Sequence, residues 1–189
     1  IIVRIGKENA NQGVEIIMKN IQRDKDVINE CKDLEFLYKF DNFPVFMGCT
    51  NQSIEKDILV NMQWEISKGS GVIQLNPLLP LDILYPESHG SGNIGRMWAE
   101  HHQEFSKFIQ HQSPNSVLEI GGAHGILSRE YKKENPINWT ILEPNPSPAK
   151  DVDATFIKGF FDDKFTFDGE IDTIIHSHVF EHVYYPDEF

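Results

Sequence analysis

The chain has 189 residues, 40% of them hydrophobic, which is enough for one domain with a hydrophobic core plus an extension. Its formal net charge of −12, from 17 basic and 29 acidic residues, argues against nucleic acid as the main partner, because no Lys/Arg cluster offers contacts to phosphates. No apolar run approaches the roughly 20 residues that span a bilayer, and two isolated cysteines, Cys31 and Cys49, suit a reducing compartment, so we expect a cytoplasmic protein.

Residues 1–82 are predicted to form an α+β extension. Apolar residues at helical spacing predict a helix over residues 13–22. Strict alternation over residues 58–67 predicts a half-buried strand, and a Gly/Ser turn at residues 68–71 connects it to residues 72–75 as an antiparallel hairpin. Pro77, Pro80 and Pro86 predict an irregular stretch after the hairpin.

The next segment combines a Gly/Ser-rich loop with a helix. The loop contains Tyr85 and His89, and it is either a lid over a ligand or a plain linker. Asn93 is the predicted N-cap of a helix that runs to about His111. The predicted apolar face of this helix consists of Ile94, Met97, Trp98, His101, Phe105, Phe108 and Ile109.

From residue 116 onward, apolar strands alternate with helical or loop segments. Strands are predicted at residues 117–120, 139–143, 154–158 and 171–176, with a helix from Gly125 to about Lys133. A proline-rich link at residues 144–148 takes the place of a helix after the second strand. This pattern predicts an α/β fold, a Rossmann-like, doubly wound parallel sheet covered on both faces.

The turn after the first of these strands is rich in glycine. The dinucleotide-binding fingerprint G-x-G-x-x-G fails here, because its third glycine position is Ile126. The pattern E-x-G-x-(G/A)-x-G is met instead, by Glu119, Gly121, Ala123 and Gly125. Glu143 lies roughly 20 residues beyond the glycines, at the end of the next strand, where a carboxylate can bind a ribose diol.

Histidines gather after the fourth predicted strand. His176, His178 and His182 lie within seven residues together with Glu181. Parallel sheets bind ligands at the carboxyl ends of their strands, so these side chains are expected to face a reaction site. A metal site and hydrogen bonds to nearby loops are two interpretations; we favour positioning of a cofactor and an acceptor, or deprotonation of the acceptor.

In order, these motifs resemble a class I S-adenosylmethionine (SAM) methyltransferase, over residues 83–189. The resemblance implies SAM as cofactor and S-adenosylhomocysteine as product. It also implies that the adenine lies against the turn at residues 158–163, near Phe160 or Phe161, with Asp162 as an acceptor. The cofactor-binding residues implied are Tyr85, Glu119, Gly121, Gly122, Ala123, Gly125, Glu143, Pro144, Phe160, Phe161, Ser177 and His178.

The Tyr85 loop, the Met97-Trp98 pair and the sequence at residues 179–182 resemble, more narrowly, bacterial methyltransferases that act on nucleotide sugars, including sugar C-methyltransferases. Such enzymes often occur in gene clusters for capsules and other surface polysaccharides. This resemblance implies a small, sugar-linked or phosphate-containing acceptor, His182 as catalytic base and His178 as a positioning residue. If both lie on one helix, they share a face.

One departure and two alternatives accompany this interpretation. The sugar C-methyltransferases carry an N-terminal zinc module with paired cysteines, which this chain lacks, so C- and O-methylation both stay open. The alternatives are an NAD-linked oxidoreductase and a non-catalytic cofactor-binding fragment. The chain begins without Met and stops soon after the fourth strand, so we expect a piece of a longer protein, inactive or nearly so alone, that pairs with another chain or forms a homo-oligomer.

Overall fold

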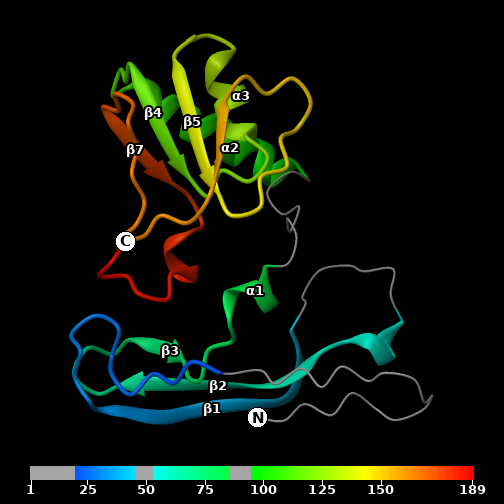
Figure 1. Ribbon diagram of the computed structural model, residues 1–189, viewed down its shortest axis with the longest axis vertical. Coiled ribbons are helices and arrows are strands. Elements are labelled where there is room, and N and C mark those ends of the chain that lie inside the picture. The colour runs from blue at the N-terminus through cyan, green and yellow to red at the C-terminus, as the bar shows by residue number, and fades with distance from the viewer. Residues whose placement is uncertain (1–19, 46–52, 86–94) are drawn as a thin grey trace. The chain divides into compact units, whose positions relative to one another are not determined.

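The computed structural model describes residues 20–45, 53–85 and 95–189 (Figure 1). The chain divides into two compact units, Ile1–Pro86 and Glu87–Phe189. Within the described part of the chain, no helix is long and apolar enough to cross a membrane.

The first unit contains an antiparallel sheet in the order β1-β2-β3. Its strands are Leu34–Pro44 (β1), Leu59–Ser67 (β2) and Ile73–Leu75 (β3), with a 3-10 helix, η1, at Ile54–Lys56. The predicted β2–β3 hairpin is confirmed, with Trp64 opposite Leu75 and Ile66 opposite Ile73. Three elements were not predicted: β1, η1 and the one-turn helix α1, Leu81–Leu84, which starts after Pro80 in the stretch predicted to be irregular.

The helix predicted over residues 13–22 is wrong where the structure describes it. Ile21 forms an antiparallel bridge with Leu78, with backbone hydrogen bonds of 2.9 and 2.8 Å in the two directions. Residues 13–19 lie outside the described residues. Pairing with the chain after β3 satisfies both the N–H and the C=O of Ile21, whereas the C=O of a residue in a last helical turn has no intrahelical partner.

A buried carboxylate stabilises the loop before β1. Asp26 is 1% exposed, and its Oδ1 accepts hydrogen bonds from the backbone N–H groups of Ile28 (2.6 Å) and Asn29 (3.3 Å). Its Oδ2 accepts a hydrogen bond from the Ser70 hydroxyl in the β2–β3 turn. Burial alone would raise the pKa of Asp26, but hydrogen bonds, those from Ser67 and Ser70 foremost, lower it to about 2.

The second unit is built on a parallel sheet in the order β6-β5-β4-β7. Its strands are Ser116–Ile120 (β4), Asn138–Glu143 (β5), Thr155–Lys158 (β6) and Thr173–His176 (β7). All four predicted strands are confirmed, and residues 144–154 between β5 and β6 contain no helix, as predicted. The helices are Arg96–Gln110 (α2) and Ile126–Lys132 (α3), with a 3-10 helix, η2, at Phe180–His182. The fold is therefore α/β and Rossmann-like, with an N-terminal antiparallel sheet.

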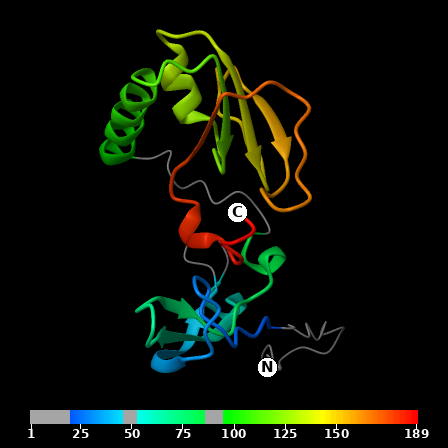
Figure 2. The ribbon, with the colours of Figure 1, turned by 90° about the vertical axis from the view of Figure 1, so that its left-hand side faces the viewer.

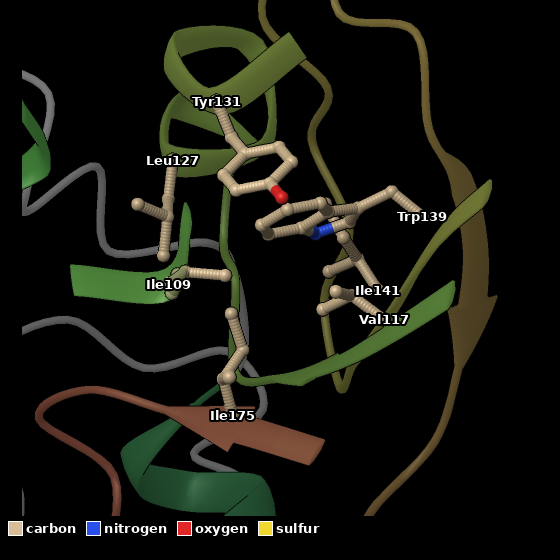
Figure 3. Close-up of a cluster of buried hydrophobic side chains, with 7 residues drawn as sticks. All are labelled: Ile109, Val117, Leu127, Tyr131, Trp139, Ile141 and Ile175. Carbon is tan, nitrogen blue, oxygen red and sulfur yellow. The ribbon is translucent and has the colours of Figure 1, made fainter. Parts of the chain in front are cut away.

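The two faces of the parallel sheet are covered differently. Helices α2 and α3 lie on the same face (Figure 2), where they enclose a core of Ile109, Val117, Leu127, Tyr131, Trp139, Ile141 and Ile175 (Figure 3). On the other face, Leu118, Ile120 and Leu142 pack against loop residues that include Phe161, Phe165 and Phe189. The carboxyl ends of the strands thus emerge between a helical layer and an aromatic loop layer.

The predicted face of α2 is partly wrong. Met97 is 84% and Phe108 61% exposed, whereas Ser106 and Ile109 are buried. At 100° per residue, Met97 and Phe108 fall more than about 90° from the stripe centred on Ile109, so the helix turns them to solvent. Asn93 and Ile94 lie outside the described residues, and Gly95 occupies the N-cap position.

Candidate active site

The strand order places a topological switch point between the ends of β4 and β7. From β4, the chain first adds β5 and β6 on one side of the sheet. It then returns and adds β7 on the other side of β4, so the order in which strands are added reverses at β4. In open α/β sheets, ligands bind at this switch point, outside the carboxyl ends of the strands. Gly121 follows β4 and Ser177 follows β7, which places both residues at this position.

The glycine turn after β4 is shaped by backbone conformations that few side chains allow. Gly121, Ala123 and Gly125 have φ angles of 68°, 46° and 75°. A Cβ atom at Gly121 would lie 2.5 Å from Cγ2 of Val179, so the turns after β4 and β7 are in direct contact. A bulkier residue at Gly121 would push these two turns apart.

Glu143 joins three of the turns at this edge of the sheet. Its Oε2 accepts a hydrogen bond from the Ala123 N–H (3.1 Å), and its Oε1 accepts one from the Asn145 N–H (3.1 Å). Its backbone carbonyl accepts a hydrogen bond from the N–H of Gly159, which follows β6, at 3.2 Å. Each carboxylate oxygen has a second lone pair, so the half-buried Glu143 keeps acceptor capacity for a ligand hydroxyl.

Glu119 lies beneath the glycine turn. It is 6% exposed, and its Oε2 accepts a hydrogen bond from the Trp139 indole N–H at 2.8 Å. A Cβ atom at Gly122 would lie 2.7 Å from the Glu119 carboxyl carbon. Burial raises the pKa of Glu119 to about 7, and the charge of Glu143 adds to the rise against the opposing effect of the indole. Glu119 therefore supports the turn from inside the protein.

The turn after β6 separates the two phenylalanines that the sequence left equivalent. Phe161 packs against Phe165 and Phe189, with ring centroids 5.6 and 5.3 Å apart. Phe160 is 47% exposed. Asp162 Oδ1 accepts a hydrogen bond from the Lys164 N–H at 3.0 Å. Phe161 therefore belongs to the aromatic loop layer, and Phe160 is the ring available to a ligand.

An aromatic and imidazole cluster lies where α2 meets the turn after β7. His101 Nε2 is 2.9 Å from Ser177 Oγ, within hydrogen-bond distance. The His178 ring lies 5.1 Å from the ring of Trp98 and 5.4 Å from that of His101, both in edge-to-face geometry. Burial, and then the charges of His102 and His178, lower the pKa of His101 below its ordinary value of 6.5, so its imidazole is neutral at pH 7.

His178 and His182 do not lie on one helix, so the condition under which they would share a helix face is not met. His178 has a φ of 54°, in the left-handed region, which no α-helix allows. His182 lies at the end of the 3-10 helix η2, and its N–H donates to the Val179 carbonyl at 2.9 Å. The two exposed imidazoles therefore belong to separate structural elements, and His178 lies 3.5 Å from a Glu181 carboxylate oxygen through its Nδ1.

The remaining predicted site residues are placed as follows. Pro144 directly follows Glu143 in the helix-free link. Tyr85 is at the end of α1 in the first unit, so its contact with the cofactor stays a prediction, and His89 lies outside the described residues. Among the described ranges, no group of three or more His, Cys, Asp or Glu side chains is arranged to hold a metal ion.

Sequence reasoning missed the contribution of α2 to the site. Trp98 and His101 were assigned to an apolar helix face, and neither was named as a site residue, yet they contact His178 and Ser177. The available signal was the His101-His102 pair, an unusual choice for a purely apolar face. The carboxyl ends of the strands thus carry backbone turns, a carboxylate with spare acceptor capacity and imidazole side chains.

Comparison with known proteins identifies the second unit. The profile of a family described as a methyltransferase domain matches residues 92–189, which is just over half of the chain. The matched segment contains α2, the glycine turn, Glu143 and the histidines after β7. A search of curated proteins finds no match to the chain.

Proposed function

The chain belongs to the methyltransferase-domain family and is a SAM-dependent methyltransferase, and from this premise we propose that it methylates a small, sugar-linked acceptor. Two finer assignments are part of the proposal. The cofactor binds at the switch point between the ends of β4 and β7, and the segment after β7 takes up the proton of the acceptor.

The observation that carries the proposed cofactor site is the convergence of three turns on Glu143. Its carboxylate binds the Ala123 and Asn145 N–H groups, and its carbonyl binds the Gly159 N–H, so its position is fixed from three directions. Its two free lone pairs match the two hydroxyls of a ribose. Phe160, exposed in the next turn, would cover the adenine, and Gly121 to Gly125 would border the methionine part of the ligand.

The chain's own residues have three tasks in this proposal. When bound, SAM supplies a methyl group that its sulfonium already activates. Glu143 and the glycine turn hold the cofactor from one side, Ser177 and His178 hold it from the β7 side, and an imidazole takes up the acceptor proton. We assign the role of base to His182, because its side chain is exposed and it matches a histidine of the family motif. We assign a positioning role to His178.

The sugar specificity rests on the narrower sequence resemblance. The Met97-Trp98 pair and residues 179–182 are the described parts of that resemblance, and the ring of Trp98 lies 5.1 Å from that of His178. A sugar hydroxyl is a weak acid, so its methylation requires a base near the attacking oxygen. A surface-polysaccharide precursor that carries a sugar and phosphates, and so offers a sugar hydroxyl, fits this requirement as the acceptor.

The cofactor assignment is tested by calorimetric titration of the full chain with S-adenosylhomocysteine and, in parallel, with NADH. We expect saturable binding of S-adenosylhomocysteine alone. Binding of NADH without S-adenosylhomocysteine would support the oxidoreductase alternative. The acceptor assignment is tested with radiolabelled SAM and a panel of nucleotide sugars, free sugars, catechols and amines; label in amines or catechols alone would contradict the sugar proposal.

The base assignment is tested with His182→Asn, which keeps a hydrogen-bonding group of similar size but cannot take a proton. With a methylated acceptor in hand, turnover should fall by about 10²-fold with unchanged S-adenosylhomocysteine affinity. Full turnover with an unchanged pH profile would leave His182 a structural role and transfer the base to His178.

A further inference from the structure

The turn after β7 has a strained backbone conformation that contacts with the surrounding structure must maintain. His178, a residue with a Cβ atom, has a φ of 54°. Such left-handed conformations are energetically unfavourable for residues with a Cβ atom and persist only where the surroundings fix them. The structure that surrounds Ser177 and His178 therefore matters for the shape of the candidate site.

Two elements contact this turn. The first is the glycine turn, where Gly121 lies against Val179 and limits its movement toward β4. The second is α2, where His101 Nε2 lies 2.9 Å from Ser177 Oγ and the His101 ring lies 5.4 Å from that of His178. α2 comes before β4 in the chain, so it lies outside the sequence motifs found from β4 to β7.

We propose that His101 is a positioning residue of the cofactor site, holding Ser177 and His178 in the conformation that faces the ligand. The inference rests on the proposed function, because the ligand contacts of Ser177 and His178 are themselves proposed. His101 touches neither cofactor nor acceptor in this account; it acts through the Ser177 hydroxyl.

The chemistry of His101 suits this role. A neutral imidazole has one N–H donor and one acceptor nitrogen, so Nε2 can pair with a hydroxyl in either direction. The half-buried position of His101 and the neighbouring imidazoles of His102 and His178 favour the neutral form. Because the ring also packs against those of Trp98 and Phe105, at 5.6 and 5.9 Å, its orientation toward Ser177 is fixed by packing.

Three variants separate the hydrogen bond from packing. His101→Phe keeps a flat ring against Trp98 and removes the nitrogen that faces Ser177. His101→Gln restores a hydrogen-bonding group near the position of Nε2 and is the rescue variant. His111→Phe, at the exposed C-cap of the same helix, is the matched control for replacing a histidine of α2 by phenylalanine.

The first readout needs no ligand. The N–H groups of His182 and Val183 donate to the carbonyls of Val179 and Phe180 at 2.9 and 3.1 Å, so their hydrogen exchange reports the order of this segment. In His101→Phe we expect exchange at these two amides to be about tenfold faster, with the amides of β4 unchanged; His101→Gln and His111→Phe should match the wild type. Equal exchange in the wild type and His101→Phe would overturn the proposal.

The second readout is the affinity for S-adenosylhomocysteine. His101→Phe and Ser177→Ala should each weaken binding by about three- to tenfold. Because both remove the same hydrogen bond, the double variant should have the affinity of whichever single variant binds more weakly. Additive losses, or wild-type affinity in His101→Phe, would overturn the proposal. If the wild-type chain itself bound no S-adenosylhomocysteine, the proposed function would be contradicted rather than the role of His101. The titration of the wild type distinguishes these two outcomes.

Discussion

Replacement of Glu119 by glutamine should remove a pH-dependent destabilisation of the second unit. In the folded chain, burial raises the pKa of this carboxyl to about 7, from an ordinary value of 4.5. A folded-state pKa above the unfolded one means that the folded chain holds the proton more tightly. The folded state is therefore penalised as pH rises from about 4.5 to about 7, and the penalty is complete above that range.

The magnitude follows from the two pKa values. At about 1.36 kcal/mol per tenfold difference in proton affinity, the interval from 4.5 to about 7 corresponds to about 3 kcal/mol at pH 8 and to almost nothing at pH 4. Glutamine cannot ionise, yet its carbonyl oxygen can still accept the Trp139 indole hydrogen bond. Glu119→Gln should thus be more stable than the wild type by up to about 3 kcal/mol at pH 8 and nearly equal to it at pH 4.

The assay is hydrogen exchange of the buried β4 and β5 amides at pH 5, 6, 7 and 8, which assigns the free energy of unfolding to the second unit. Glu134→Gln, which removes an exposed carboxylate just after α3, is the control and should change stability by less than about 0.5 kcal/mol at each pH. A stability difference between Glu119→Gln and the wild type that does not grow with pH would refute the reasoning.

Three further predictions concern other positions. Gly125→Ala should destabilise the second unit by about 2–4 kcal/mol in urea unfolding, because φ is 75° and the added Cβ would lie 2.7 Å from Val152 Cγ1; a loss below about 1 kcal/mol would show that the turn relaxes freely. Asp26→Ala should destabilise the first unit by about 2–4 kcal/mol at pH 7, since it leaves the Ile28 and Asn29 N–H groups without their acceptor. The same carboxylate, whose pKa is lowered to about 2 from an ordinary value of 3.8, stabilises the wild type fully above about pH 4 and less as pH falls toward 2; a loss independent of pH in this range would contradict that assignment. Glu143→Ala should weaken S-adenosylhomocysteine binding by about 1–3 kcal/mol in calorimetry, and unchanged affinity would remove Glu143 from the proposed site.

The parallel sheet could be predicted from the sequence because its central strands, β4 and β5, are buried on both faces. Val117, Ile141 and Ile175 lie in one core and Leu118 and Leu142 in the other, so the strands read as continuous apolar runs. β1 could not be predicted in the same way. Phe36, Tyr38 and Phe40 are exposed on an edge strand, and its register against β2 is irregular, so no clean alternation marks it.

The candidate site was predictable where one motif lies on one turn, and not where contacts join distant segments. The spacing from Gly121 placed Glu143 at the end of the next strand, and in the structure its carboxylate binds the Ala123 N–H of the glycine turn; its contact with a ribose stays a prediction. The contact of His101 with Ser177 joins residues 76 positions apart, and no local pattern encodes it. The left-handed conformation of His178 was equally hidden, because tertiary contacts impose it on a residue that allows a helix.

The most direct test of the account is a crystal structure of the full chain with S-adenosylhomocysteine. We expect the ligand at the carboxyl ends of β4 and β7, its ribose hydroxyls bonded to the Glu143 carboxylate, its adenine beside Phe160 and its amino-acid part along residues 121–125. S-adenosylhomocysteine bound elsewhere on the chain, with Glu143 still bonded only to the Ala123 and Asn145 N–H groups, would contradict the account.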